Sequence, residues 1–209
     1  LIANLHQALV KTSNPDLVKK LQEKYKAVFV DEFQDTDRQQ FEIFNRAFGD
    51  NTILFYIGDP KQSIYAWRKA DIFSYFNARS GVKNRYGMNH NFRSAENLIH
   101  AMNLFFKPQP DFDTFYFGNE PESIQYIHVE SPEDNTKGYL AENGNAATPI
   151  VVITCDKKEK IAAAAAAQAA QLLQNTSYEI INGKGSRPIT PADIGILVRT
   201  GKEGRMVKH

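Results

Sequence analysis

The chain has 209 residues, a formal net charge of +1 at pH 7, 42% hydrophobic residues and 23% charged residues. This composition is typical of a globular protein with a substantial core, and it excludes an intrinsically disordered chain. No apolar stretch approaches the ~20 residues that a membrane-spanning helix needs, so we expect no membrane partner. The single cysteine, Cys155, excludes an internal disulfide and fits a reducing compartment, so we expect a cytoplasmic protein.

The chain starts with two expected helices and a strand. Residues 2–11 and 15–25 carry apolar residues at helical spacing, and Pro15 is well placed at a helix start. AVFV (27–30) then predicts a buried strand. Because the chain does not begin with Met and its last residues, GKEGRMVKH, read like a helix that has just begun, we expect a piece of a longer protein.

A helix and a second strand follow. Thr36 and Gln39 match a capping box at the start of this helix, and Gly49 suits its C-terminal cap. Its apolar face is formed by Phe41, Phe44 and Phe48. TILFYI (52–57) predicts another buried strand.

Two more helices are expected before residue 108. Asp71 can cap a helix over IFSYFNAR (72–79) that stops at Gly81. Ser94 can cap another helix, which Pro108 prevents from continuing. Its expected core positions are Leu98, Met102 and Phe105. Helices that alternate with fully apolar strands predict an α/β fold whose parallel sheet is covered on both faces.

The second half of the chain has a different texture. Residues 108–148 are rich in Pro, Asp, Asn and Gly and predict an irregular junction, with a strand at IQYIHV (124–129). PIVVITC (149–155) and DIGILVR (193–199) predict buried strands. KEKIAAAAAAQAAQLLQ (158–174) between them predicts a helix that packs on a sheet through small side chains.

The string VDEFQDTD (30–37) places carboxylates directly after a buried strand, where parallel sheets have their functional crevice. Asp31 can hold a hydrated Mg²⁺, which needs only one or two carboxylates besides waters and substrate phosphates. Glu32 can orient or deprotonate an attacking water. The plain alternative is that the pair only favours the N-terminus of the following helix electrostatically.

The string GDPKQSIYAWRKAD (58–71) follows the second strand. Gln62 can sense a phosphate, because its amide both donates and accepts hydrogen bonds. Tyr65, Trp67 and Arg68 combine aromatic rings with a guanidinium, as in proteins that hold single-stranded nucleic acid without reading its sequence. The alternative is that Tyr65 and Trp67 are core aromatics.

The string NHNFRS (89–94) places Arg93 just before an expected helix start. A helix N-terminus favours anions, so a bound phosphate would relieve the conflict with the arginine charge. Phe92 can pack on a flat ring. A surface salt bridge of Arg93 is the plain alternative.

Together, VDEFQDTD, IGDPKQSIYAWR and NFRS resemble motifs II, III and IV of superfamily-one DNA helicases of the UvrD type. ADIFSYFNARS (70–80) and ADIGILVR (192–199) look like the RecB branch of that family, the beta subunits of exodeoxyribonuclease V. The resemblance is specific over residues 25–106 and weaker over 107–209, where it depends on the order of elements.

The resemblance implies roles for individual residues. Asp31 resembles the Mg²⁺-binding acid, and Glu32 resembles the residue that activates the hydrolytic water. Gln62 and Arg93 match residues that contact the γ-phosphate of ATP, and Phe92 stands where the family has an adenine-stacking aromatic. Contacts to single-stranded DNA are implied for Tyr65, Trp67 and Arg68.

The resemblance also implies an organisation and partners. Residues 1–107 would belong to a first RecA-like motor domain, 108–148 to an irregular junction and 149–209 to the start of a second. ATP and Mg²⁺ would be the cofactors, and single- and double-stranded DNA with RecC-like and RecD-like subunits would be the partners. The implied activities are those of a helicase and exonuclease in DNA repair and recombination.

The sequence departs from the family pattern in two respects. Lys69 follows the arginine of the second string, where the family commonly has Gly. No G-x-x-x-x-G-K-S/T phosphate-binding loop occurs in the 209 residues, so we predict that this chain alone does not hydrolyse ATP.

Three alternatives stay open at the level of sequence. The chain can belong to another UvrD-type branch, such as AddA. It can be a non-catalytic DNA- or partner-binding module, although mere binding does not need Asp31, Glu32, Gln62 and Arg93 together. A metal-dependent nuclease is the third, but it would want two metals ~4 Å apart, and no suitable lysine arrangement accompanies the carboxylates.

Overall fold

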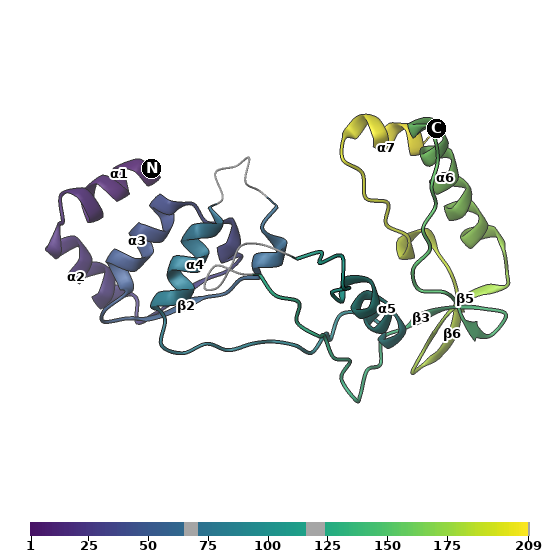
Figure 1. Cartoon of the computed structure of the whole chain (residues 1–209), viewed down its shortest axis with the longest axis horizontal. Helices are drawn as coiled ribbons and strands as arrows, with labels where there is room; N and C mark the ends of the chain where they lie inside the picture. The colour runs from purple at the N-terminus through teal and green to yellow at the C-terminus, as the bar shows by residue number, and fades with distance from the viewer. Residues whose placement is uncertain (65–70, 116–123, 209) are drawn as a thin grey trace. The chain divides into compact units, whose positions relative to one another are not determined.

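The computed structural model describes residues 1–64, 71–115 and 124–208. The chain forms two compact units, Leu1–Gly87 with Pro110–Tyr126 and Met88–Gln109 with Ile127–His209. The predicted α/β class is confirmed at the level of a mixed fold that has one parallel and one antiparallel sheet (Figure 1). No helix among the described residues is long and apolar enough to span a membrane.

The first unit contains most of the helices predicted for the first half of the chain (Figure 1). Its elements are α1 (Ile2–His6), a π-helical turn η1 (Gln7–Lys11), α2 (Pro15–Lys24), β1 (Ala27–Val30), η2 (Phe33–Asp35), α3 (Arg38–Phe48), β2 (Ile53–Tyr56), η3 (Pro60–Gln62) and α4 (Ile72–Gly81). Pro15 occupies the first turn of α2 and Asp71 caps α4, both as predicted. Gly49 is the C-terminal cap of α3, also as predicted.

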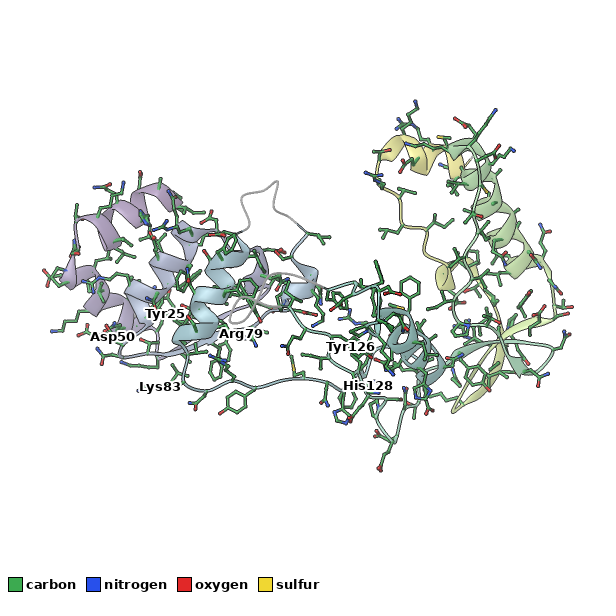
Figure 2. The ribbon with its side chains drawn as sticks, in the orientation of Figure 1. Tyr25, Asp50, Arg79, Lys83, Tyr126 and His128 are labelled. Carbon is green, nitrogen blue, oxygen red and sulfur yellow. The ribbon has the colours of Figure 1, made fainter. Side chains whose placement is uncertain are left out.

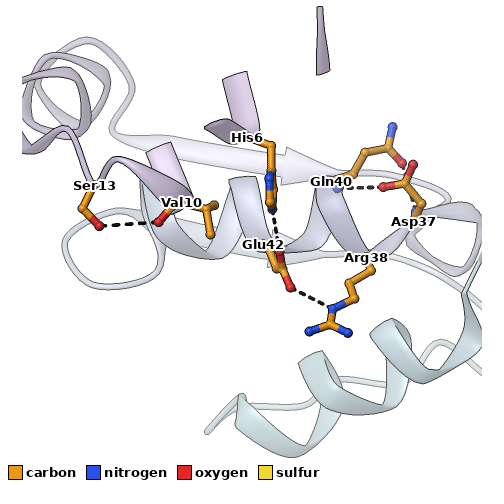
Figure 3. Close-up of polar contacts among 7 residues, drawn as sticks. All are labelled: His6, Val10, Ser13, Asp37, Arg38, Gln40 and Glu42. Atoms are coloured by element: carbon orange, nitrogen blue, oxygen red, sulfur yellow. Dashed lines mark hydrogen bonds and ion pairs between the residues drawn. The ribbon is translucent and has the colours of Figure 1, made fainter. Parts of the chain in front are cut away.

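The start of α3 differs from the prediction by one residue. Asp37, not Thr36, is the cap: its carboxylate accepts from the backbone N–H of Gln40, and the Gln40 side chain accepts from the N–H of Asp37 (Figure 3). Thr36 is buried, and its carbonyl accepts from the N–H of Asp71 at 3.3 Å. The capping box therefore exists, but tertiary contacts of Thr36 move it along by one position.

Strands β1 and β2 pair in parallel, with Ala27 opposite Ile53 and Val30 opposite Tyr56. The sheet has two strands among the described residues and is covered on one face only, so the predicted cover on both faces is wrong there. The covered face presents Val28, Val30, Leu54 and Tyr56 to the helical core. On the other face Phe29 is 63% exposed and Phe55 is 40% exposed.

The helical core fills the space between η1, α2, α3 and the covered sheet face. Its buried members are Leu9, Ile43, Ala47 and Phe48. Tyr25, which Figure 2 labels at the C-terminal end of α2, is part of this packing. Its ring lies edge-on to that of Phe48, with ring centroids 6.3 Å apart. Side chains of η1, α2 and α3 therefore pack together against the sheet.

The second unit contains one long helix and an antiparallel sheet. Its elements are α5 (Glu96–Phe106), β3 (Tyr139–Glu142), β4 (Asn145–Ala146), α6 (Lys158–Gln174), β5 (Tyr178–Asn182), β6 (Gly185–Pro188), η5 (Pro191–Asp193) and α7 (Gly201–Lys208). The strand order is β4-β3-β5-β6. The sequence analysis predicted none of these strands, two of which lie in the region it expected to be irregular.

Two predictions about α5 are wrong. Its N-terminal cap is Ala95 rather than Ser94, and no side chain caps it. Ile99 and Asn103 are its buried residues, whereas Met102 and Phe105 are exposed. The reason is a pair of hydrogen bonds: the Asn103 amide donates to the carbonyl of Val129 at 2.6 Å and accepts from its N–H at 3.0 Å.

Three predicted strands are not strands in the structure. Residues 124–129 are irregular, and Val129 uses its backbone for the Asn103 side chain. Residues 149–155 and 193–199 are not part of the antiparallel sheet, and Leu197 is fully exposed. An apolar run becomes a strand only when a neighbouring strand is available to pair with it, and the described residues supply no pairing strand to these runs. The predicted helix over 158–174 is confirmed and packs against α7 (Figure 1).

Candidate functional site

The first two strings, residues 30–37 and 58–71, begin at the same edge of the parallel sheet. Val30 and Tyr56, the last residues of β1 and β2, lie opposite each other. Beyond them, the N–H of Ile57 donates to the carbonyl of Val30 at 2.9 Å, and the N–H of Phe33 donates to that of Ile57 at 2.8 Å. The strands therefore keep the two following loops together at their carboxyl ends, the position at which parallel sheets bind ligands.

Asp31 and Glu32 turn the chain sharply as it leaves β1. Glu32 has φ 51° and ψ 40°, in the left-handed region that residues with side chains rarely adopt. The Oδ1 atom of Asp31 accepts from the N–H of Glu32 at 2.9 Å, and the carbonyl of Glu32 accepts from the N–H of Asp35 at 2.9 Å. Both Asp31 and Glu32 are exposed, so a ligand can reach their carboxylates.

Gln34 joins the two strings. Its side chain is only 1% exposed. Its Nε2 donates to Oε2 of Glu32 at 2.7 Å, and its Oε1 accepts from the backbone N–H of Asp59 at 3.0 Å. The sequence pattern of the first string assigns no role to Gln34, because its second partner, Asp59, comes from another loop.

Asp59 organises the second string. Its Oδ1 accepts from the N–H of Lys61 at 3.0 Å and pairs with the Lys61 ammonium at 2.7 Å. Its Oδ2 accepts from Nε2 of Gln62 at 3.3 Å. A continuous chain of hydrogen bonds thus runs from Glu32 through Gln34 and Asp59 to Gln62.

A cluster of aromatic rings packs around Phe33, at the base of the loop that follows β1. Phe33 is fully buried, and its ring centroid lies 4.2 Å from that of Tyr56 and 6.2 Å from that of Phe41. Burial raises the pKa of Tyr56 to about 12, so its phenol stays neutral at physiological pH. The polar loops therefore stand on an apolar base that restricts their movement.

The third string lies in the second unit. Oδ1 of Asn91 accepts from the N–H of Arg93 at 2.8 Å and from that of Ser94 at 3.0 Å, which fixes a tight turn. Phe92 is 67% exposed and Arg93 is exposed. The turn thus exposes the ring of Phe92 and the guanidinium of Arg93, which are neighbours in the sequence, to solvent.

A short backbone pairing holds this turn in place. The N–H of Asn91 donates to the carbonyl of Glu130 at 2.9 Å, and the N–H of Glu130 donates to that of Asn89 at 2.7 Å. Nε2 of His90 lies 3.1 Å from Oε2 of Glu130. The His90 ring also lies beside that of Phe92, with centroids 6.3 Å apart.

The structure brings some of the sequence-predicted residues together. Asp31, Glu32 and Gln62 gather at one sheet edge of the first unit, and Phe92 and Arg93 share one turn of the second. The expected DNA contacts Tyr65, Trp67 and Arg68 lie outside the described residues.

The first unit offers a carboxylate of the kind that Mg²⁺ uses. No group of three or more His, Cys, Asp or Glu side chains within residues 1–64, 71–115 and 124–208 is placed to hold a metal ion. Mg²⁺ does not need such a cage, because it keeps several waters and binds one or two carboxylates with substrate phosphates. Asp31 is exposed, and the one hydrogen bond that the structure gives its carboxylate comes from the N–H of Glu32, so it fits this mode of binding.

Comparison with known families gives a match that covers the first two strings. Residues 1–83 match the UvrD/REP helicase N-terminal domain. This range includes the first two strings and the whole parallel sheet.

Individual relatives match more of the chain. Over 88% of its length, the chain is 38% identical to RecBCD enzyme subunit RecB of Buchnera aphidicola subsp. Acyrthosiphon pisum, and the match covers 16% of that relative. It is 32% identical over its whole length to RecB of Escherichia coli, of which 18% is covered. It is 31% identical over its whole length to RecB of Haemophilus influenzae, of which 18% is covered. The chain therefore spans less than a fifth of the length of the curated relatives it matches.

Proposed function

We propose that this chain, whose residues 1–83 belong to the UvrD/REP helicase N-terminal domain family, is a segment of a RecB-like subunit that couples ATP hydrolysis to movement on single-stranded DNA. The intact protein would be an ATP-dependent DNA helicase and an exodeoxyribonuclease V beta subunit in DNA repair and recombination. The observation that carries this proposal is the hydrogen-bond chain from Glu32 to Gln62, which links two loops at the carboxyl edge of a parallel sheet.

Three residues of the first unit, Asp31, Glu32 and Gln62, have roles in the proposal. Asp31 holds Mg²⁺, which when bound neutralises phosphate charge during phosphoryl transfer. Glu32 orients the attacking water and accepts its proton. Gln62 contacts the γ-phosphate through an amide that the structure holds against Asp59. The exposure of Asp31 and Glu32 and their position after β1 support these assignments.

The remaining assignments concern residues with exposed side chains or outside the described ranges. Arg93 contacts the γ-phosphate and Phe92 stacks on adenine; their exposure on one fixed turn supports this. Tyr65, Trp67 and Arg68 contact single-stranded DNA by stacking and charge. Single- and double-stranded DNA and RecC-like and RecD-like subunits are the partners of the intact protein.

We assign the chain to parts of two RecA-like motor domains. In this assignment residues 1–107 are the C-terminal part of the first, 108–148 a junction and 149–209 the start of the second, whereas the compact units divide the chain after Gly87 and the junction contains β3 and β4. The parallel pairing of β1 and β2, with α3 between them in the chain, supports a RecA-like first domain. Because a phosphate-binding loop of the G-x-x-x-x-G-K-S/T type does not occur in the sequence, the 209-residue chain alone does not hydrolyse ATP.

The test uses the intact protein that carries this segment. Asp31→Asn should raise the Mg²⁺ concentration needed for half-maximal DNA-stimulated ATP hydrolysis by about 10-fold or more, because loss of a ligand charge weakens cation binding. Asp16→Asn, an exposed aspartate in the first turn of α2, is the matched control and should behave as wild type. An unchanged Mg²⁺ dependence in Asp31→Asn would contradict the assignment.

A further inference from the structure

The side chain of Gln34 is almost fully removed from solvent, yet both ends of its amide are hydrogen-bonded. Its Nε2 faces a carboxylate oxygen of Glu32, which can only accept, and its Oε1 faces the N–H of Asp59, which can only donate. A flipped amide would put two acceptors together at one end and two donors at the other. The amide therefore has one orientation that satisfies all four groups.

The backbone at residue 58 leaves room for this amide and little else. A β-carbon added to Gly58 would lie 2.7 Å from Oε1 of Gln34, 3.1 Å from its backbone N and 3.2 Å from the backbone N of Phe33. The first contact is too short for a real β-carbon, and the other two are tight. The absence of a side chain at Gly58 thus allows the second loop to pass close enough for the N–H of Asp59 to reach Gln34.

Glu32 itself has few restraints on its side chain. Its backbone is fixed in the left-handed region, while its side chain is exposed and has several rotatable bonds. The hydrogen bond that the structure gives its carboxylate comes from Gln34, at 2.7 Å. A buried amide that is hydrogen-bonded at both ends has little freedom to move. Such side chains fix the geometry of the neighbouring groups that act on a ligand.

We propose that Gln34 is a positioning residue, whose amide orients the Glu32 carboxylate and ties it to the backbone of Asp59. The proposal rests on the proposed function, in which Glu32 acts on the attacking water. Gln34 touches neither nucleotide nor water and acts through Glu32. Any displacement of the loop that carries Asp59 and Gln62 is passed through the same amide to Glu32, so the state of the second string sets the alignment of the first.

Two substitutions separate the two ends of the amide. Gln34→Glu keeps an acceptor for the N–H of Asp59 and, at a pH at which the new carboxyl is ionised, replaces the donor to Glu32 by a second negative charge. Gln34→Met has similar length and removes both hydrogen bonds. Gln39→Glu, on the exposed side of α3, repeats the first chemical change away from the site and is the matched control.

Kinetics of the intact protein give the first readout. Both Gln34 variants should lower kcat for DNA-stimulated ATP hydrolysis about 10–100-fold, as is usual when a supporting hydrogen bond is lost. The KM for ATP should stay within about twofold, because Gln34 does not bind the nucleotide. In a Glu32→Gln background, Gln34→Glu should change kcat by less than about twofold, since residues that act as one unit are not additive.

Hydrogen exchange gives a readout that needs no activity. Exchange of the Asp59 amide, followed by mass spectrometry on the intact protein without nucleotide, should accelerate in Gln34→Met and stay protected in Gln34→Glu. A role in stability alone would give the opposite kinetic pattern, with Gln34→Glu lowering kcat equally in both backgrounds. That result, or a kcat of Gln34→Glu within about twofold of wild type, would overturn the proposal.

The proposed function and the positioning role can fail separately. If Glu32→Gln keeps wild-type kcat, the proposed function is wrong, whereas the exchange experiment still measures the Gln34–Asp59 bond. If Glu32→Gln loses activity and Gln34→Glu does not, only the positioning role is wrong. If Gln34→Met does not fold, Gln34→Glu decides alone, because it retains the bond to Asp59.

Discussion

Nε2 of His6 on α1 lies 2.6 Å from Oε2 of Glu42 on α3, and the His6 side chain is buried between the helices (Figure 3). The second carboxylate oxygen of Glu42 accepts from Nε of Arg38 at 2.8 Å. One carboxylate therefore joins the N-terminal helix to the helix that covers the parallel sheet. Its hydrogen bonds with His6 and then with Arg38 lower the pKa of Glu42.

A lowered pKa in the folded state means that Glu42 stabilises the fold above the pKa of the unfolded chain, and that this contribution is lost as the pH falls through the folded pKa. We expect Glu42→Gln to reduce the free energy of unfolding at pH 7 by about 1 kcal/mol, a value discounted for partial exposure. Urea denaturation at pH 7 and at progressively lower pH should show the difference from wild type shrinking. Glu23→Gln, an exposed control on α2, should show no difference at any pH.

Substitution of Gly58 by alanine should destabilise the first unit. The added β-carbon would lie 2.7 Å from Gln34 Oε1, so either the amide or the loop must move. We expect a loss of about 1–3 kcal/mol in urea denaturation, which is typical of overpacking. Gly81→Ala is the control, because a β-carbon there meets nothing within 4 Å. Equal stability of the two variants would mean that the passage at Gly58 is not tight.

The uncovered sheet face should make the isolated chain self-associate. Phe29 and Phe55 stack on it with ring centroids 4.8 Å apart and nearly parallel planes. Contiguous exposed apolar surface of this kind is a site of association. Phe29→Thr with Phe55→Thr, which keeps strand-forming residues, should lower the average mass in sedimentation toward that of the monomer. Phe112→Thr, an exposed phenylalanine outside the sheet, should leave the mass unchanged.

The second unit contains a bidentate ion pair between Arg187 and Asp193, whose effect on the pKa of Asp193 can be measured by NMR. Nη1 and Nη2 of Arg187 donate to the two carboxylate oxygens of Asp193 at 2.7 and 2.6 Å, and Thr190 donates to the same carboxylate. The Arg187 hydrogen bonds, followed by those of Thr190, hold the pKa of Asp193 well below its ordinary value. In Arg187→Ala, a carbon-detected titration should show that pKa move upward, toward the ordinary value. In the control Arg205→Ala on α7, it should not move.

The gathering of Asp31, Glu32 and Gln62 at one sheet edge could be predicted from sequence, because they follow apolar strands whose parallel pairing places their carboxyl ends together. The internal geometry of the site could not. Gln34 and Asp59 are 25 positions apart, and their contact depends on the close passage at Gly58. Nothing in the local pattern distinguishes Gln34 from the other polar residues of the string.

The fold was predictable where local signals agreed with tertiary contacts. The helix start near residue 36 has two overlapping capping patterns, Thr36 with Gln39 and Asp37 with Gln40, and the burial of Thr36 selects the second. For α5, the hydrogen bonds between Asn103 and Val129 turn a polar residue inward, which apolar periodicity cannot anticipate.

The sequence carries one signal of the antiparallel sheet, the Asn143-Gly144 pair, which the expectation of an irregular junction did not include. Asn143 and Gly144 have φ values of 52° and 77°, and they connect β3 to β4 as Asn-Gly pairs do in tight hairpins. In the next hairpin Asn182 is the last residue of β5 and pairs with Gly185 of β6, so Gly183 and Lys184 form the two-residue connection. The first of these turns lies within residues 108–148, whose composition favours irregular structure, and the strands beside it have only four and two residues.

The most direct test of the account is the rate of DNA-stimulated ATP hydrolysis by the intact protein with Glu32→Gln. If Glu32 accepts the proton of the attacking water, the rate should fall about 10²–10⁴-fold while ATP still binds, because the amide keeps the shape of the side chain but not its basicity. Glu23→Gln should hydrolyse ATP like wild type. Hydrolysis by Glu32→Gln at the wild-type rate would contradict the assignment of a nucleotide site to the carboxyl edge of this sheet.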